Sequence, residues 1–494
     1  MGRRMPIFYS ALLLTGVNLL LRLVSTSFQV YLSGRIGAAG IGLLQLVLSV
    51  SALSMTASMA GIRTTAMYLT AEELGKNRPG AVKWVLSGCF TYSIIISVTI
   101  CLGVNLAAPL LAKEWVGDPR TADAIRLFAA FLPVICLCGV MTGYFTAANR
   151  IATLAAVEIG EQMISLICTM LLLSFWAGSS PYRACISVIF GSGLSACVTL
   201  GILILLRAKT RADGIRRIPI SKRLLNTALP LALADDLKAG ISTTENLMVP
   251  KRLALYGGSV EPLAAFGTVC GMVFPVLMFP AAIIYALAEL LIPELARCNA
   301  AGSHGRIQYL VSRSLRLTML YGCALGGLML LVADKLCMLL YNSPDAGYYL
   351  RLYSPMIPML YCDTITDAMT KGLGQQKACV RYNIITSAMD VIFLYILLPK
   401  YGMQGYLWSF LITHLVNYLL SLNRLLRITE KQIPIHIPIF ALGATAASVL
   451  IASAVSNTIL SCLAFLLILG CALFLLGILK KKDIAWITGL WHRR

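Results

Sequence analysis

Long apolar stretches recur along almost the whole chain and limit what it can fold into. Each stretch reaches the roughly 20 residues that a helix needs to cross a bilayer. A backbone inside lipid must satisfy its own hydrogen bonds, so we expect an all-α membrane protein. Hydrophobic residues make up 58% of the chain and charged residues 13%, which excludes a soluble domain and a disordered chain. The fourteen predicted transmembrane helices cover residues 10–32, 40–70, 81–110, 122–146, 152–175, 183–206, 223–248, 262–295, 308–333, 347–370, 378–398, 403–426, 435–456 and 459–479.

The Lys and Arg residues are distributed unevenly between the connections of these helices. Most of them fall in alternate connections, on the side that holds both ends of the chain. The positive-inside rule therefore predicts cytoplasmic N- and C-termini and a multi-pass protein of the cytoplasmic (inner) membrane. The net charge of +20 then faces the anionic headgroups of membrane lipids, and nucleic acid is not an expected partner.

A strongly polar segment divides the chain into two similar parts. We predict an N-terminal lobe of six helices at 1–206, a basic cytoplasmic linker at 207–222, a second six-helix lobe at 223–428, and two further helices with a cytoplasmic tail at 429–494. Phe131-Leu-Pro-Val-Ile precedes Tyr353-Ser-Pro-Met-Ile by the same offset that separates Leu69-Thr-Ala-Glu from Leu291-Ile-Pro-Glu. These matches indicate two pseudo-symmetric lobes, an arrangement in which transporters hold substrate between halves that rock.

The first predicted helix carries a polar face within its apolar sequence. Asn18, Arg22, Ser25 and Gln29 share this face by their helical spacing. An arginine near the middle of a bilayer costs about 2.5–3.5 kcal/mol on insertion scales. Arg22 therefore either lines a water-filled cavity or pairs with a neighbouring helix.

The seventh predicted helix repeats this pattern with Asp235, Lys238, Ser242 and Asn246. Asp235 either lines the same cavity or simply neutralises Lys238. Arg63, on the second helix, either joins the cavity or extends its side chain to the inner surface. We predict that these residues and the polar face of the first helix together bind substrate.

Cations in an enclosed wet chamber suit an anionic ligand that carries several oxygens. The guanidinium group of Arg22 can donate two parallel hydrogen bonds to a phosphate. This chemistry favours a polyprenyl-diphosphate-linked oligosaccharide as the substrate. A drug antiporter would instead place carboxylates in the cavity, and the first helix carries none.

Acidic residues occur in other apolar segments and could couple transport to an ion gradient. The ion-coupling candidates are Asp236, Asp363, Asp367, Asn383 and Asp390. Their oxygens could hold Na⁺, or a buried carboxylate could carry H⁺. Alternatively, these acids pair with the nearby bases Lys371, Lys377 and Arg381.

The sequence contains no constellation typical of an enzyme. It has no Walker loop, and His304, His414, His436 and His492 are scattered without metal-ligand spacing, so we expect neither catalysis nor a cofactor. Two glycine pairs have the spacing of close helix contacts, namely Gly139 with Gly143 and Gly322 with Gly326.

Several motifs resemble a known superfamily. Lys371-Gly-Leu-Gly-Gln-Gln-Lys and Leu398-Pro-Lys-Tyr-Gly-Met-Gln-Gly-Tyr resemble polysaccharide-type exporters. Asn246-Leu-Met-Val-Pro-Lys-Arg-Leu and Pro293-Glu-Leu resemble the stage V sporulation protein B family. Both belong to the multidrug, oligosaccharidyl-lipid and polysaccharide (MOP) exporter superfamily. The resemblance implies its MATE-like fold, with helices 1, 2, 7 and 8 lining the cavity.

The resemblance also implies a function. We expect a flippase that moves an undecaprenyl-diphosphate-linked sugar, either lipid II or a polysaccharide repeat unit, across the cytoplasmic membrane by alternating access. Its role would lie in spore cortex peptidoglycan synthesis, as a monomer beside cell-wall synthases. The alternatives are a cation-coupled multidrug antiporter of the MATE type and a non-transporting membrane scaffold for wall or spore assembly.

Overall fold

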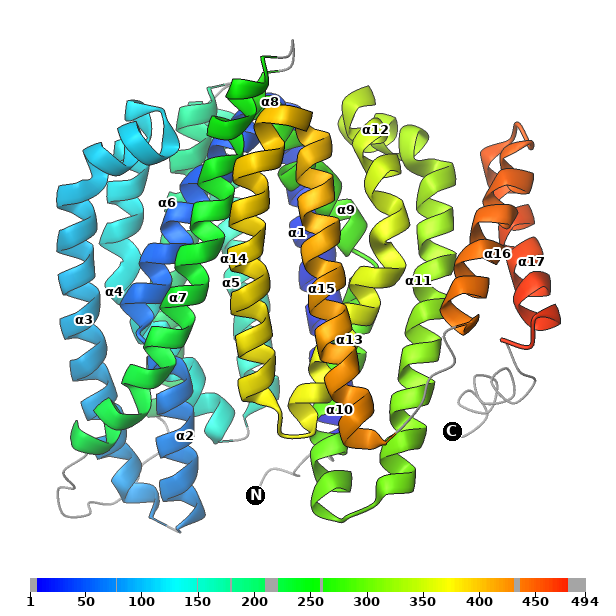
Figure 1. Cartoon of the computed structure of the whole chain (residues 1–494). Helices are drawn as coiled ribbons and strands as arrows, with labels where there is room; N and C mark the ends of the chain where they lie inside the picture. The colour runs from blue at the N-terminus through cyan, green and yellow to red at the C-terminus, as the bar shows by residue number, and fades with distance from the viewer. Residues whose placement is uncertain are drawn as a thin grey trace. The chain divides into compact units, whose positions relative to one another are not determined.

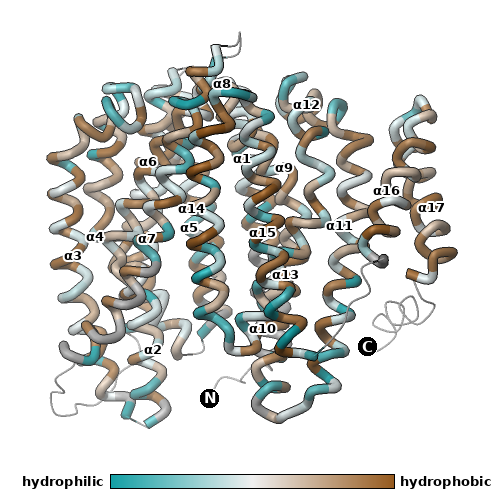
Figure 2. Tube along the Cα trace, in the orientation of Figure 1, coloured by the Kyte–Doolittle hydropathy of each residue, from teal (hydrophilic) through white to brown (hydrophobic). Residues whose placement is uncertain are grey.

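The computed structural model describes residues 7–76, 78–148, 150–177, 180–208, 221–257, 261–430 and 436–478, which form helices joined by short connections (Figure 1). Eight helices in this part of the chain are long and apolar enough to cross a membrane, and a ninth span results if one bent pair is counted as a unit. Figure 2 shows hydrophobic residues along most of α17 (Thr458–Leu475), as a lipid-facing helix requires. The all-α membrane fold is confirmed, and the number of fourteen spans stays a prediction.

The chain forms two compact units. The first unit comprises Met1–Gly271 with Leu394–Met403, and the second comprises Met272–Phe393 with Gln404–Arg494. The predicted lobe boundaries remain a prediction. The elements that begin in the first unit are α1 (Ile7–Met59), α2 (Ile62–Gly75), η1 (Pro79–Ala81), α3 (Val82–Leu110), η2 (Leu111–Val116), η3 (Pro119–Thr121), α4 (Ala122–Ala147), α5 (Ile151–Leu172), η4 (Leu173–Ala177), α6 (Pro181–Ala208), α7 (Ser221–Leu253), η5 (Ala254–Tyr256), α8 (Pro262–Thr268) and η6 (Val269–Val273). Those that begin in the second are α9 (Phe274–Met278), α10 (Ala281–Ala300), α11 (His304–Tyr341), α12 (Pro344–Tyr353), η7 (Ser354–Met356), α13 (Ile357–Gly372), α14 (Gln376–Tyr401, whose end lies in the first unit), α15 (Met403–Thr429, from Gln404 onward), α16 (His436–Ser453) and α17.

Helix α1 contains the predicted span 10–32 and the larger part of the predicted span 40–70, separated by a sharp turn. Gly37 adopts φ 68° and ψ 179°, which a glycine accepts without a Cβ clash. The turn falls in the connection expected between 32 and 40. A second break follows at Ala60 and Gly61, which both have positive φ and separate α1 from α2. The hydroxyl of Tyr92 donates to the carbonyl of Ala60 at 3.4 Å, which gives the break an additional polar contact.

Close helix packing in the first unit depends on glycine. A Cβ added at Gly143 of α4 would lie 2.5 Å from the carbonyl oxygen of Arg63 and 3.0 Å from the backbone nitrogen of Met67. A Cβ at Gly139 would lie 3.1 Å from the Met59 side chain. The predicted contact of this glycine pair is therefore confirmed, and it brings α4 against α1 and α2. Apolar side chains from α2, α3, α4 and α5 form the core around this contact.

The second unit uses the same device. A Cβ at Gly322 of α11 would lie 2.6 Å from Cα of Pro358, and one at Gly326 would lie 3.2 Å from the Ser354 carbonyl oxygen. This confirms the second predicted glycine contact, between α11 and the segment η7–α13. Helices α16 and α17 pack on α11 (Figure 1). The fully buried ring of Phe465 on α17 lies against Gly327 of α11.

Candidate functional site

The polar face of α1 lies in the first unit and contacts α5. Arg22 is partly buried, and Ser25, one turn further on, accepts a hydrogen bond from the Gln162 amide at 3.3 Å. The Nε2 atom of Gln29 is buried and has no hydrogen-bond partner among the described residues. The side chain of Asn18 lies outside the described part of the structure. Part of this predicted face therefore meets α5, and its role in substrate binding stays a prediction.

The polar stripe of α7 divides into two parts. Asp235, Lys238 and Ser242 are exposed. Asn246, by contrast, turns toward the second span of α1, where its amide donates to the Ser49 hydroxyl at 3.1 Å. Thr243 donates to the carbonyl of Ser49 at 3.2 Å in the same contact. Asn246 therefore joins two helices of the first unit, while the charged part of the stripe remains open.

The beginning of α7 also contacts the end of α2. The guanidinium of Arg223 contacts Glu72 at 2.5 Å and Glu73 at 3.2 Å, both at the end of α2. Glu73 is only 3% exposed, so this partner neutralises a charge that water hardly reaches. Polar contacts thus hold α7 to α1 and α2 near both of its ends.

Arg63 of α2 is exposed, and its backbone lies against Gly143 of α4. The same unit holds Arg22 and Lys238, so the three predicted substrate-binding cations belong to one compact unit.

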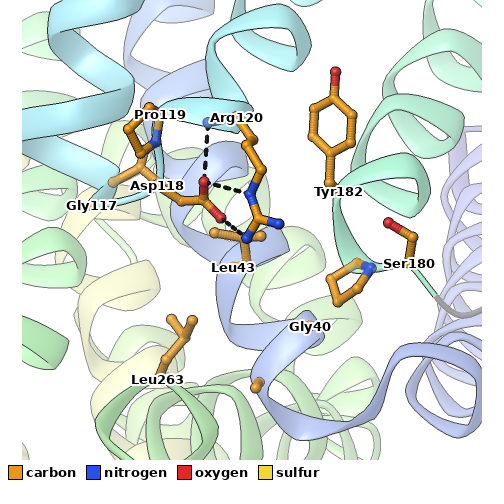
Figure 3. A pocket seen from close by; sticks show the side chains of 12 residues that line it. Gly40, Leu43, Gly117, Asp118, Pro119, Arg120, Ser180, Tyr182 and Leu263 are labelled. Carbon is orange, nitrogen blue, oxygen red and sulfur yellow. Dashed lines mark hydrogen bonds and ion pairs between the residues drawn. The ribbon is translucent and has the colours of Figure 1, made fainter.

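A pocket of about 460 Å³ lies beside the Gly37 turn of the first unit (Figure 3). Its wall includes Arg120, whose guanidinium donates two hydrogen bonds to the Asp118 carboxylate, at 3.0 and 2.8 Å. The backbone N–H of Arg120 donates to the same carboxylate at 3.0 Å. These hydrogen bonds hold the pKa of Asp118 below its usual value. Because the two charges neutralise one another, the pocket offers little net charge to a ligand.

Buried polar side chains of the second unit meet around Asp363 of α13. Asn417 of α15 donates to one carboxylate oxygen at 2.9 Å, and Nδ1 of His414 lies 3.2 Å from the other. The Asp363 side chain is 11% exposed and that of His414 is 35% exposed. The ring of Phe410 covers the imidazole at 4.3 Å between centroids.

Asp390 of α14 binds the same face of α15. Its Oδ1 accepts hydrogen bonds from Ser409 at 2.5 Å and from Thr413 at 3.4 Å. Asp367 instead forms an ion pair with Lys371 at 2.5 Å, one of the alternatives that the sequence left open. Two of the ion-coupling candidates, Asp363 and Asp390, therefore share one polar network.

The other two ion-coupling candidates lie elsewhere. Asn383 is partly buried on α14, and Asp236 lies on α7 in the first unit with its buried Oδ1 lacking a hydrogen-bond partner among the described residues. The ion-coupling role of all five candidates stays a prediction.

Sequence reasoning missed the contribution of α15 to this network. His414 was one of four scattered histidines, because its partner Asp363 lies 51 residues earlier in the chain. A signal was nevertheless present: Ser409, Thr413, Asn417 and Ser421 recur at every fourth position of an apolar helix. All four residues are less than 9% exposed.

The chain is similar to several known transporters. The MatE family model matches residues 248–396. Stage V sporulation protein B of Bacillus subtilis (strain 168) is 21% identical over 407 residues, which cover 80% of this chain and 78% of that protein. The solved structure of lipid II flippase MurJ in an inward closed conformation has a TM-score of 0.70 at 11% identity and covers 93% of this chain and 98% of MurJ. An inward-facing multidrug resistance MATE transporter of the MOP superfamily has a TM-score of 0.68 at 15% identity, covering 85% of this chain and 100% of the transporter. The chain therefore has the fold of the MATE/MOP transporters and a sequence similar to that of stage V sporulation protein B, as its motifs predict.

Proposed function

We propose that this protein is a flippase for a polyprenyl-diphosphate-linked sugar, with lipid II or a polysaccharide repeat unit as its substrate. Arg22, Arg63 and Lys238 bind the diphosphate headgroup, while the polyprenyl tail stays in the lipid. Alternating access carries the headgroup from the cytoplasmic leaflet to the outer leaflet, driven by an ion gradient or the membrane potential. The similarity to stage V sporulation protein B supports a role in sporulation, and we propose that this role is the synthesis of spore cortex peptidoglycan.

The exposure of Lys238 and Asp235 carries this proposal. Lys238 lies about 25 Å along α7 from Ser221, at 1.5 Å per residue, and therefore far from both helix ends. The sequence predicts that α7 spans the membrane, although α7 is not among the eight apolar spans found in the structure. An exposed charge in the middle of a spanning helix would be costly against hydrocarbon, and we propose that Lys238 faces water. Arg22 and Arg63 belong to the same unit, and guanidinium and ammonium groups suit the binding of a diphosphate.

Names of similar proteins give independent support. The solved structure with the TM-score of 0.70 is that of a lipid II flippase. A drug antiporter shares the fold. Chemistry favours the flippase, because Arg22 and Lys238 would repel the cationic drugs that such an antiporter exports.

The test reconstitutes the full chain in proteoliposomes that contain lipid II with a fluorescent headgroup. We expect the wild type to move the probe between leaflets, and Lys238→Gln and Arg22→Gln each to slow it about tenfold, since a lost charge-assisted hydrogen bond is worth about 1.5–3 kcal/mol. Lys251→Gln is the matched control: it lies on the same helix, but its amine contacts the backbone carbonyl of Glu114. It should retain the wild-type rate.

The same vesicles distinguish the alternatives. A multidrug antiporter would move a cationic dye against its gradient and leave the lipid II probe in place. A scaffold would move neither compound. Either result would refute the flippase.

A further inference from the structure

A glutamate of α5 lies near the arginine that begins the proposed headgroup site on α1. Helices α1 and α5 pack together, and the amide of Gln162 donates to the Ser25 hydroxyl at 3.3 Å. Glu158 lies one turn before Gln162 on the same face of α5. Arg22 likewise lies about one turn before Ser25 on α1. Both helices are odd-numbered spans of the predicted topology and run in the same direction, so Glu158 comes to about the level of Arg22.

Arg63 approaches α5 from the other side, on α2. Its Cβ lies 3.9 Å from the position of a Cβ at Gly139 of α4. The adjacent residue of α4, Cys138, is an electrostatic neighbour of Glu161 on α5. Neighbouring residues of α4 thus meet Arg63 and α5, and Glu158 interacts electrostatically with Arg63. One acid of α5 therefore lies near both arginines to which the proposed function assigns the diphosphate.

Glu158 and Arg63 do not form a closed structural ion pair. Within the described part of the chain, their charges interact without a direct hydrogen bond between the two side chains. Arg63 is exposed and Glu158 is only partly buried, so neither group is sealed by packing. An ion pair that holds helices together is in direct contact, as Arg223 is with Glu73 at 3.2 Å in the same unit. The Arg63 guanidinium can therefore turn either to Glu158 or to a ligand.

A diphosphate bound by two arginines needs a competitor in order to leave. Guanidinium groups hold it through charge-assisted hydrogen bonds, which are stronger than those between neutral groups. Arg22 and Arg63 belong to one compact unit, so a motion of that unit as a body does not separate them. A tethered carboxylate offers the guanidinium another partner at high effective concentration, and its like charge repels the phosphate oxygens. Both effects lower the affinity for the headgroup and shorten the time for which it stays bound.

We propose that Glu158 promotes release of the headgroup, because its carboxylate competes with the bound diphosphate for Arg63. This inference rests on the proposed flippase and names a residue that acts on its release step. Glu158 acts through Arg63 and is therefore a positioning residue. Glu161, by contrast, interacts with Thr199 of α6 and Cys138 of α4, and it takes no part in the competition.

Equilibrium binding to the purified full chain tests this competition. The probe is farnesyl diphosphate, and uncharged farnesol is the reference for its isoprenoid tail. Glu158→Gln should bind farnesyl diphosphate about tenfold more tightly than the wild type does, since one contact with a charged group is worth at least this factor. Glu158→Asp keeps the charge and should bind as the wild type does. Glu161→Gln is the matched control: it removes the same charge from the same helix and should leave the affinity unchanged. No variant should change the affinity for farnesol.

A double-mutant cycle identifies the partner through which Glu158 acts. In an Arg63→Gln background, Glu158→Gln should give no gain in affinity for farnesyl diphosphate, because the group for which it competes is absent. A merely structural role predicts that Glu158→Gln weakens binding or leaves it unchanged. Either of those results with Arg63 present, or a gain that persists without Arg63, would overturn the proposal.

Flipping of the fluorescent lipid II probe in proteoliposomes tests the release step itself. Glu158→Gln should lower the half-saturating probe concentration about tenfold and also lower the maximal rate, because the headgroup dissociates more slowly. An unchanged or higher maximal rate would contradict the release role and leave the flippase intact. If the probe moves in no vesicle, the flippase fails, and the binding cycle still decides whether Glu158 competes for Arg63.

Discussion

Gly143 provides a sharp test of the packing that supports the candidate site. Replacing a helical glycine by alanine stabilises a helix by about 1 kcal/mol through its higher helix propensity. At Gly143 the new Cβ would lie 2.5 Å from the Arg63 carbonyl oxygen and 3.0 Å from the Met67 nitrogen. Both neighbours are backbone atoms, so no rotamer change relieves the contact. Overpacking of this kind costs about 1–3 kcal/mol. An overpacking cost of about 3 kcal/mol, at the upper end of this range, exceeds the propensity gain of about 1 kcal/mol. We therefore expect Gly143→Ala to destabilise the protein by about 2 kcal/mol.

Gly139→Ala is the matched control on the same helix. Its Cβ would lie 3.1 Å from the terminal methyl of Met59, a flexible side chain that can move. The propensity gain should then dominate, and the variant should be as stable as the wild type or more stable by up to about 1 kcal/mol. The two substitutions, one turn apart, are therefore expected to have opposite signs.

Thermal unfolding in detergent with a thiol-reactive fluorophore can measure this difference. Cys89 and Cys136 are fully buried in the first unit and become reactive when the unit unfolds. At roughly 2 °C per kcal/mol, Gly143→Ala should lower Tm by about 4 °C. If both alanine variants raise Tm, α2 and α4 are not in the close contact described, and the position of Arg63 does not depend on it.

Three further changes test other contacts. Arg223→Gln should destabilise the protein by about 1–2 kcal/mol, because Glu73 loses the partner of a buried charge; unchanged urea unfolding would show that this ion pair contributes nothing. A double-mutant cycle with Asp118→Asn and Arg120→Gln should show favourable coupling at pH 7. The folded-state pKa of Asp118 is lowered, so this coupling should be lost as pH falls through that value, and coupling unchanged at pH 2 would contradict the pair. Asn457→Ala should cost about 1 kcal/mol, because the Asn457 side chain accepts from two backbone N–H groups at the start of α17; hydrogen exchange there should accelerate.

Much of the fold could be predicted because its signals are local in the sequence. An apolar run of 20 residues indicates a membrane helix wherever it occurs, and a glycine pair four residues apart indicates a close contact. The Gly37 turn likewise falls in a predicted connection. The break at Ala60 could not be foreseen, since positive φ at an alanine has no signature in its own residue type. It depends on neighbouring Gly61 and on the contact with Tyr92.

The candidate site was predictable only in part, for a related reason. Asp363 and Asp390 could be singled out because an acid within an apolar helix is conspicuous by itself. The significance of His414 depends on its distance from Asp363, and the two residues lie on different helices. The opposite outcome occurred at Asn246, whose spacing placed it with Lys238 and whose amide contacts Ser49 instead. Helical spacing gives a shared face but not the neighbour that covers each part of it.

The attachment of α7 has a consequence for how the proposed flippase moves its substrate. Contacts at Arg223 and Asn246 fix this helix to α1 and α2 near both ends, and Lys238 lies between them. Arg22 belongs to the same unit, so the two cations keep their separation when that unit moves as a body. A diphosphate bound by both cations would then remain bound while the unit rocks. Its release would require water to compete for the two cations, or a change in the charge around them, because the distance between the cations does not change. Breaking the attachment with Arg223→Gln should therefore weaken headgroup binding while leaving Lys238 itself unchanged. Headgroup affinity equal to that of the wild type would show that α7 moves independently of the first unit.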